Sequence, residues 1–421
     1  MVTVGACLLP SCNRSVEAAS PHPTVEQPTD HSIRKKWVAR THGFENEEEV
    51  LSAPGLVHRS LRWCQARWEQ LVGFAAMVVG LAILSVIPIL NFIAFGYLLE
   101  SSARVARSGR LRDAMTGVRA AAGVGTSVIC IWLLLFPLRF VISVWRDAAL
   151  VAQGSGVERA WRFAVYILAL LTVLHLGWAL IRGGRIRHFL WPAPIRLFRW
   201  LSTFNPPPDL KPRCLELWRS LRLSHYFLLG IRGFVGALAF LILPVLLLII
   251  GGKVASAGGV LLSLLGATLL FPAVLYLPFL QTRFAIENRF GALFEVGEVR
   301  RLFRRAPVAF WLGLLVTVLF SLPLYLLKVE LPPRELAWLP AIVFVLFILP
   351  ARILVGWAFS RALKRDEDRH GFFRFLFRMA LLPVVGFYIL FLYLTQYLSW
   401  NGSLSLLEQH AFMVPAPLLG I

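Results

Sequence analysis

The stretch from Leu71 to Arg107 reads LVGFAAMVVGLAILSVIPILNFIAFGYLLESSARVAR, and it decides how the rest of the chain is interpreted. No Asp, Glu, Lys, Arg or His occurs from Leu71 to Leu99. A helix that crosses the ~30 Å hydrocarbon core of a bilayer needs about 20 apolar residues, so this run is long for one crossing and short for two. The sequence therefore predicts an integral membrane protein made of helices.

Pro88 divides this stretch, because a proline removes a helix hydrogen bond and clashes with the preceding turn. Arginines flank the stretch on both sides, and such flanks favour the cytoplasmic face. We therefore predict a hairpin over 69–107: a helix at 69–87, a bend at 88–91 and a second helix. Asn91 is expected to cap that second helix, and Gly96 to allow close helix packing. The alternative is one tilted span with the N-terminus outside.

The composition supports a membrane protein, since 57% of the residues are hydrophobic and 16% are charged. Soluble domains carry about 25% charged residues. The net charge of +20 is typical of nucleic-acid binders as well, but here the arginines lie between apolar segments. That distribution predicts anionic lipid headgroups as partners and no nucleic acid. The five cysteines form no CxxC pair, and no metal site, disulfide framework or cofactor is predicted.

Seven further apolar segments follow the hairpin, each long enough to cross a bilayer. The predicted fold class is therefore all-α: a polytopic transmembrane helical bundle consisting of the Pro-bent hairpin and seven more spans. These spans are expected at 122–145, 161–181, 228–250, 257–280, 307–327, 338–358 and 379–399.

The charges of the connecting segments predict an orientation. Lys and Arg total 26 in the connectors 104–121, 182–226, 281–306 and 359–378, against 5 in the opposite set at 146–160, 251–256, 328–337 and 400–421. Positive connectors stay in the cytoplasm. The sequence thus predicts a multi-pass protein of the cell (inner) membrane, with a cytoplasmic N-terminus and an extracytoplasmic C-terminus.

Two regions outside the spans have distinct patterns. Residues 1–55 are polar and are expected to be a disordered cytoplasmic tail, which leaves 56–421 as the transmembrane domain. In the connector 182–226, the segments Ile195–Phe204 and Leu215–Phe227 alternate apolar residues with arginines, as does Leu56–Trp68. These patterns predict helices in the headgroup layer. Nucleic-acid binding by 182–226 is an alternative that the membrane surface makes unnecessary.

Arg139 and Arg352 are the charged residues nearest to the middle of predicted spans, and each follows a proline by two positions. A proline-broken helix frees carbonyl groups that a guanidinium can satisfy. One interpretation is an anion or lipid-headgroup site at these arginines. The other is that each long side chain extends to its nearer membrane surface.

A second group of polar candidates lies near span ends. Arg283 and Glu287 are four residues apart, so an ion pair on one helical face is expected. The remaining candidates follow the hairpin bend or flank this pair, and they are Asn91, Tyr97, Glu100, Gln281 and Asn288.

The run Pro88-Ile-Leu-Asn91-Phe-Ile-Ala-Phe-Gly96-Tyr97, which enters a helix ending in arginines, resembles the opening of a known family. That family contains uncharacterised bacterial and archaeal multi-pass membrane proteins that share a domain of unknown function. The resemblance covers about residues 70–120, with looser similarity over Pro272–Arg305. It implies a membrane protein and assigns no role to any residue.

Two functions are consistent with these patterns. The first is a non-enzymatic, membrane-organising or accessory component, with an unknown membrane-protein partner and a basic cytoplasmic surface that faces lipid. The second is a transporter or flippase of a lipid or other anionic amphiphile that uses Arg139 and Arg352. A membrane-bound enzyme ranks third, because the sequence contains no HExxH, GxSxG or Walker motif and no evident nucleophile–base pair.

Overall fold

The computed structural model describes residues 56–203, 215, 219, 221–326, 338–398, 402–408, 410 and 412–415. The predicted tail at 1–55 lies outside these residues. Every regular element in the described part of the chain is a helix, which confirms the all-α class. The following account concerns residues 65–421, together with the helix α2 that leads into them.

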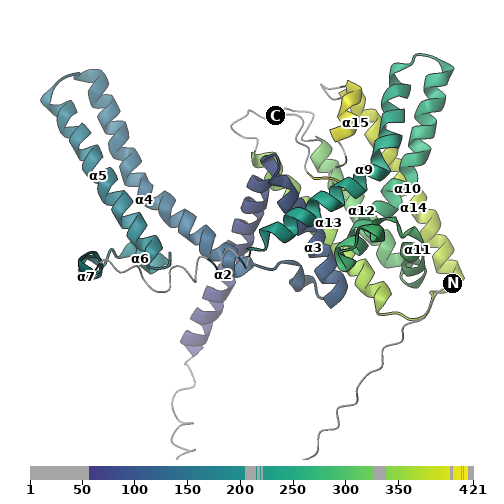
Figure 1. Ribbon diagram of the computed structural model, residues 1–421, viewed down its shortest axis with the longest axis horizontal. Coiled ribbons are helices and arrows are strands. Elements are labelled where there is room, and N and C mark those ends of the chain that lie inside the picture. The colour runs from purple at the N-terminus through teal and green to yellow at the C-terminus, as the bar shows by residue number, and fades with distance from the viewer. Residues whose placement is uncertain are drawn as a thin grey trace, which may run out of the picture. The chain divides into compact units, whose positions relative to one another are not determined.

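Two helices with a turn between them form the opening stretch. Helix α2 (Leu56–Val86) ends before Pro88, and α3 (Asn91–Ser108) begins after it. The Tyr97 hydroxyl lies 3.0 Å from the Met77 sulfur, although twenty residues of straight helix would span about 30 Å. The chain therefore reverses at the turn, and Figure 1 shows α2 and α3 running in opposite directions.

The prediction that Asn91 caps α3 is wrong. Leu90 holds the cap position without any side-chain hydrogen bond, and Asn91 is the first, buried residue of the helix. The turn itself supplies the acceptors. The N–H of Asn91 donates to the Ile87 carbonyl (3.0 Å), and the N–H of Phe92 donates to the Ile89 carbonyl (3.2 Å). Because the main chain satisfies these donors, a side-chain cap is unnecessary.

Eight helices in the described residues are long and apolar enough to cross a membrane. One is the Arg67–Val86 part of α2, and seven match the predicted spans, although residues 327 and 399 lie outside the described part. Several helices extend beyond the predicted bounds; the last begins at Gly371 rather than 379. The seven are α4 (Val118–Val151), α5 (Gly156–Ile181), α9 (Leu223–Lys253), α10 (Ala257–Glu287), α12 (Pro307–Leu326), α13 (Trp338–Leu363) and α14 (Gly371–Leu398).

Shorter helices occupy the described connectors. Helix α7 covers nearly all of the predicted segment 195–204, whereas the predicted segment 215–227 is partly outside the described residues and joins α9 at its end. The short elements are η1 (Leu111–Ala114), α6 (Ile186–Leu190), α7 (Pro194–Thr203), η2 (Phe290–Phe294), α11 (Val296–Arg305), η4 (Gly402–Leu404) and α15 (Ser405–Glu408).

Helix α3 lies in the core and packs against α9, α10 and α13. A β-carbon added at Gly96 would overlap the Tyr226 carbonyl oxygen of α9, and one at Gly230 would overlap the Phe92 carbonyl oxygen of α3. On α13, a β-carbon at Gly356 would overlap the Ser102 carbonyl of α3. These backbones touch because glycine removes the side chain between them, which confirms the expectation for Gly96.

Candidate functional site

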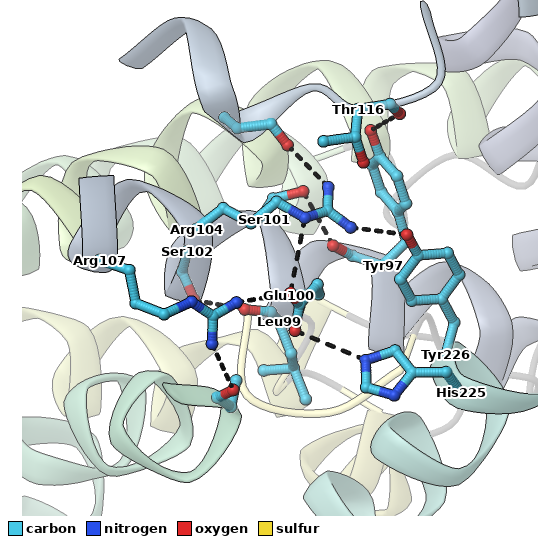
Figure 2. Close-up of polar contacts among 12 residues, drawn as sticks. Tyr97, Leu99, Glu100, Ser101, Ser102, Arg104, Arg107, Thr116, His225 and Tyr226 are labelled. Atoms are coloured by element: carbon cyan, nitrogen blue, oxygen red, sulfur yellow. Dashed lines mark hydrogen bonds and ion pairs between the residues drawn. The ribbon is translucent and has the colours of Figure 1, made fainter. Parts of the chain in front are cut away.

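A polar network surrounds Glu100 at the C-terminal half of α3 (Figure 2). Positions 100, 104 and 107 share one helical face, because residues four and seven apart lie one above the other. The buried Glu100 carboxylate lies 2.6 Å from Nη2 of Arg107 and 3.5 Å from Nε of Arg104. Two guanidinium groups of its own helix thus hold this carboxylate.

Helix α9 completes the network from a position more than a hundred residues away. Nε2 of His225 lies 3.6 Å from Glu100, and Nη2 of Arg104 donates to the hydroxyl of Tyr226 (2.6 Å). The Arg104 guanidinium also lies 5.5 Å from the centre of the Tyr97 ring, whose hydroxyl donates to the Thr116 carbonyl (3.1 Å). Figure 2 shows these side chains converging on the end of α3.

Arg107 carries the network to α10. Its Nη1 donates to the carbonyls of Ile286 (3.3 Å) and Ala285 (3.5 Å), which lie in the last turn of that helix. A cation is favourable there, because the final carbonyls lack partners within the helix. The Glu100 network therefore joins the ends of α3, α9 and α10. One carboxylate oxygen of Glu100 faces both guanidinium groups and the other faces the His225 imidazole, an arrangement suited to a structural clamp.

A second ionic cluster lies where α10 ends and α11 begins. Arg283 contacts Glu287 at 2.8 Å, as the four-residue spacing predicted, and it also pairs with Glu295. Arg289 lies 2.9 Å from Glu287 and 2.6 Å from Glu295. The hydrogen bond from Arg283, together with the charge of both arginines, holds the pKa of Glu295 below its ordinary value. Asn288 closes α10 in the left-handed conformation, with a φ of 52°.

Arg352 lies in the interior of the bundle, and only 3% of its surface is exposed. Its Nη2 donates to Oε1 of Gln281 (2.8 Å) and to the Phe412 carbonyl, and its guanidinium lies 5.6 Å from the centre of the Phe95 ring. Gln281 in turn donates to the Met413 carbonyl. The protein therefore encloses this arginine rather than exposing it on the outside of the bundle. Nη1 of Arg352 has no hydrogen-bond partner among the described residues, and no described carboxylate pairs with it.

Arg139 has a different environment. It lies on α4 with an exposed side chain, and the structure does not bring it together with Arg352. The candidates thus separate into several places: Tyr97 and Glu100 belong to the α3 network, Gln281 to the Arg352 site, and Arg283, Glu287 and Asn288 to the end of α10.

Sequence reasoning missed the partners that come from distant segments. His225 and Tyr226 precede an apolar span and resemble ordinary interfacial residues. Phe412 and Met413 contribute only main-chain carbonyls, which leave no signature in a sequence. Among the described residues, no group of His, Cys, Asp and Glu side chains is arranged to hold a metal ion.

A family model described as a protein of unknown function (DUF4013) matches residues 212–331. This segment includes α9, α10, η2, α11 and α12, and hence His225, Tyr226 and the Arg283 cluster. It contains the Pro272–Arg305 stretch, but it does not contain residues 70–120, on which the resemblance mainly rested. No curated protein and no solved structure matches the chain. Similarity to DUF4013 over 212–331 supports the prediction of an uncharacterised family.

Proposed function

We propose that the protein is a non-enzymatic component of the cell membrane that binds anionic lipid headgroups through a basic cytoplasmic surface. Its role would be to organise the membrane or to serve as an accessory subunit of another membrane protein. The eight apolar helices and the match to a domain of unknown function agree with an uncharacterised membrane protein. The proposal of lipid binding depends on one surface, formed by α7.

That surface combines exposed apolar side chains with arginines. On α7, Ile195 and Phe198 are 75% and 77% exposed, and both neighbours Arg196 and Arg199 are exposed as well. Residues three apart lie on the same side of a helix, so the apolar pair and the basic pair form adjacent stripes. Such a helix is stable in the headgroup layer, where the apolar stripe enters lipid and the arginines meet phosphate.

Helix α7 is held next to the end of a candidate span. The Trp200 ring packs 5.5 Å from that of Trp178, near the end of α5, and the Arg182 guanidinium lies 5.5 Å from the Trp178 ring. Because α5 ends at Ile181, this contact supports a position of α7 at the level where that helix would leave the hydrocarbon. Trp and Arg prefer that depth, since each has an apolar body and a polar end.

A spin label at position 195 tests this proposal. The variant Ile195→Cys, made on a cysteine-free background, is reconstituted in nanodiscs with and without phosphatidylglycerol. We expect a lipid-soluble relaxing agent to reach the label in the anionic discs, and R196Q/R199Q to reduce that access. The variant R146Q/R159Q removes two exposed arginines elsewhere and should leave the signal unchanged. If the lipid-soluble agent does not reach the label in either kind of disc, the label lies in water and the proposal is contradicted.

One observation favours the second candidate, a transporter or flippase of an anionic amphiphile. Arg352 is a buried cation whose Nη1 lacks a described partner, and such residues often mark substrate paths in membranes. Lipid scrambling in proteoliposomes tests this candidate: R352Q should abolish the activity, whereas R139Q, on an exposed side chain, should retain it. Equal rates for both variants, or no scrambling at all, would count against transport.

A further inference from the structure

Two hollows lie beside each other on the surface of the bundle, separated by one pair of side chains. One, of about 370 Å³, lies among α10, α11, α12 and α14, and the other, of about 360 Å³, lies among α9, α10 and α11. Tyr276 and Arg300 line both. Nε of Arg300 donates to the Tyr276 hydroxyl (3.0 Å), and its guanidinium lies 5.3 Å from the ring, so this pair forms the wall between the hollows.

Apolar side chains form most of both walls. Phe279, Phe303 and Leu382 line the first hollow, and Phe240 and Leu269 line the second. Most of these side chains come from helices apolar enough to span a membrane, where a surface hollow is filled by lipid chains rather than water. The volumes suit a flexible hydrocarbon chain.

Basic groups line the same hollows. Arg300 belongs to both, and Arg378 lines the first. Neither arginine has a carboxylate partner among the described residues, whereas their neighbours Arg301 and Arg374 pair with Glu298 and Asp368. Two uncompensated guanidinium groups beside an apolar groove favour an anion that is attached to hydrocarbon.

We propose that these hollows bind one anionic glycerophospholipid, with its phosphate between Arg300 and Arg378 and one acyl chain in each hollow. This inference rests on the proposed function and deepens it, because it gives the lipid-binding role a defined site. The residues of α9, α10 and α11 that form it lie within 212–331, the segment that matches the family of unknown function.

The test uses phosphatidylglycerol with a photoreactive group near the end of an acyl chain, incorporated in nanodiscs with the full chain. Crosslinked peptides are mapped by mass spectrometry. We expect labelling of α10 and α14, weaker labelling by the matching phosphatidylcholine, and a roughly tenfold loss in R300Q/R378Q, since each basic residue attracts anionic lipid several-fold. The control R361Q/R365Q removes two exposed arginines that do not line the hollows and should label normally.

The variant Gly297→Leu tests the apolar half of the proposed lipid site without changing any charge. A β-carbon at Gly297 meets nothing within 4 Å, so a side chain can begin there without a clash, and Gly297 lines the second hollow, which we expect leucine to occupy in part. Labelling should fall in this variant while its thermal unfolding remains that of the parent. Equal labelling by both lipids, or labelling unaffected by R300Q/R378Q and Gly297→Leu, would overturn the site.

The same crosslinking maps distinguish this site from the α7 surface. Phosphatidylglycerol labelling that depends on Arg196 and Arg199 but not on Arg300 would leave the proposed function standing and reject the groove. An absence of any preference for the anionic lipid would reject both.

Discussion

Helices α4 and α13 have almost the same hydropathy, yet they occupy different environments. None of the residues in the most apolar 18-residue window of α4 is buried, whereas half of those in α13 are. Helix α4 packs with α5 as a hairpin whose two helices lie side by side (Figure 1). Helix α13 packs against α3 and α12 in the core. Hydropathy therefore identifies helices that suit a bilayer, but it does not identify those that form the bundle.

Small residues and buried polar groups account for the difference. At Gly96, Gly230 and Gly356 the backbones of core helices touch, whereas Gly123 on α4 and Gly177 on α5 have nothing within 4 Å of an added β-carbon. The close neighbour of Gly125 on α4 is the Ala76 side chain of α2, not a backbone carbonyl. Lipid chains are as apolar as leucine, so apolar surface alone gives helices little reason to associate in a bilayer. Close backbone contact and internal hydrogen bonds supply that reason.

The largest difference in stability is expected between two carboxylate substitutions, one in the core around α3 and one in the α4–α5 hairpin. Glu100→Ala leaves Arg104 and Arg107 without their buried partner and should destabilise the protein by about 3–5 kcal/mol. The Glu158 side chain on α5 accepts a hydrogen bond from the N–H of Gly154 (2.7 Å) at the start of that helix, so Glu158→Ala should cost about 0.5–1 kcal/mol. Chemical unfolding in detergent micelles measures both. Equal losses would show that the Glu100 network does not stabilise the bundle.

A smaller effect is expected from adding one methyl group in each region. Gly96→Ala forces α3 away from the Tyr226 carbonyl and should cost about 2–3 kcal/mol. Gly123→Ala meets open space and improves helix propensity, so its effect should stay within about 1 kcal/mol and favour folding. The same unfolding assay compares them. A Gly96→Ala variant as stable as the parent would refute close packing of α3 on α9.

The smallest effects are expected in the pH dependence of stability, which has a different pH window near the α4–α5 hairpin and in the core. Burial and the charges of Arg182, Arg187, Arg185 and Arg196 lower the pKa of His188, next to α5, from its ordinary 6.5. Its contribution to stability is complete above pH 6.5 and is lost as the pH falls through the lowered value. The contribution of Glu295 is complete above its ordinary pKa of 4.5 and is lost only at lower pH.

Thermal unfolding measured as a function of pH checks both windows. Replacing His188 by Gln should remove the loss of thermal stability that begins as the pH falls below 6.5. Replacing Glu295 by Gln should remove the loss that begins as the pH falls below 4.5. Each variant serves as the control for the other. If one variant altered both windows, the two side chains would not titrate independently, and the assignment of one window to each region would be wrong.

The sequence predicted the elements whose causes are local. Pro88 marks the turn, apolar length marks the eight candidate spans, and the four-residue spacing marks the Arg283–Glu287 pair. It misplaced the cap of α3, because turn carbonyls replaced the side chain of Asn91. It could not predict that His225 meets Glu100 or that the Phe412 carbonyl meets Arg352, since such contacts depend on how distant helices pack. The membrane orientation stays a prediction.

Helix α3 has a consequence for biosynthesis. It is not among the eight helices apolar enough to cross a membrane by themselves, yet fourteen of its eighteen residues are buried. Its neighbours α9 and α13 leave the ribosome more than a hundred and more than two hundred residues later. Helix α3 therefore cannot reach its packed environment until those helices have been synthesised.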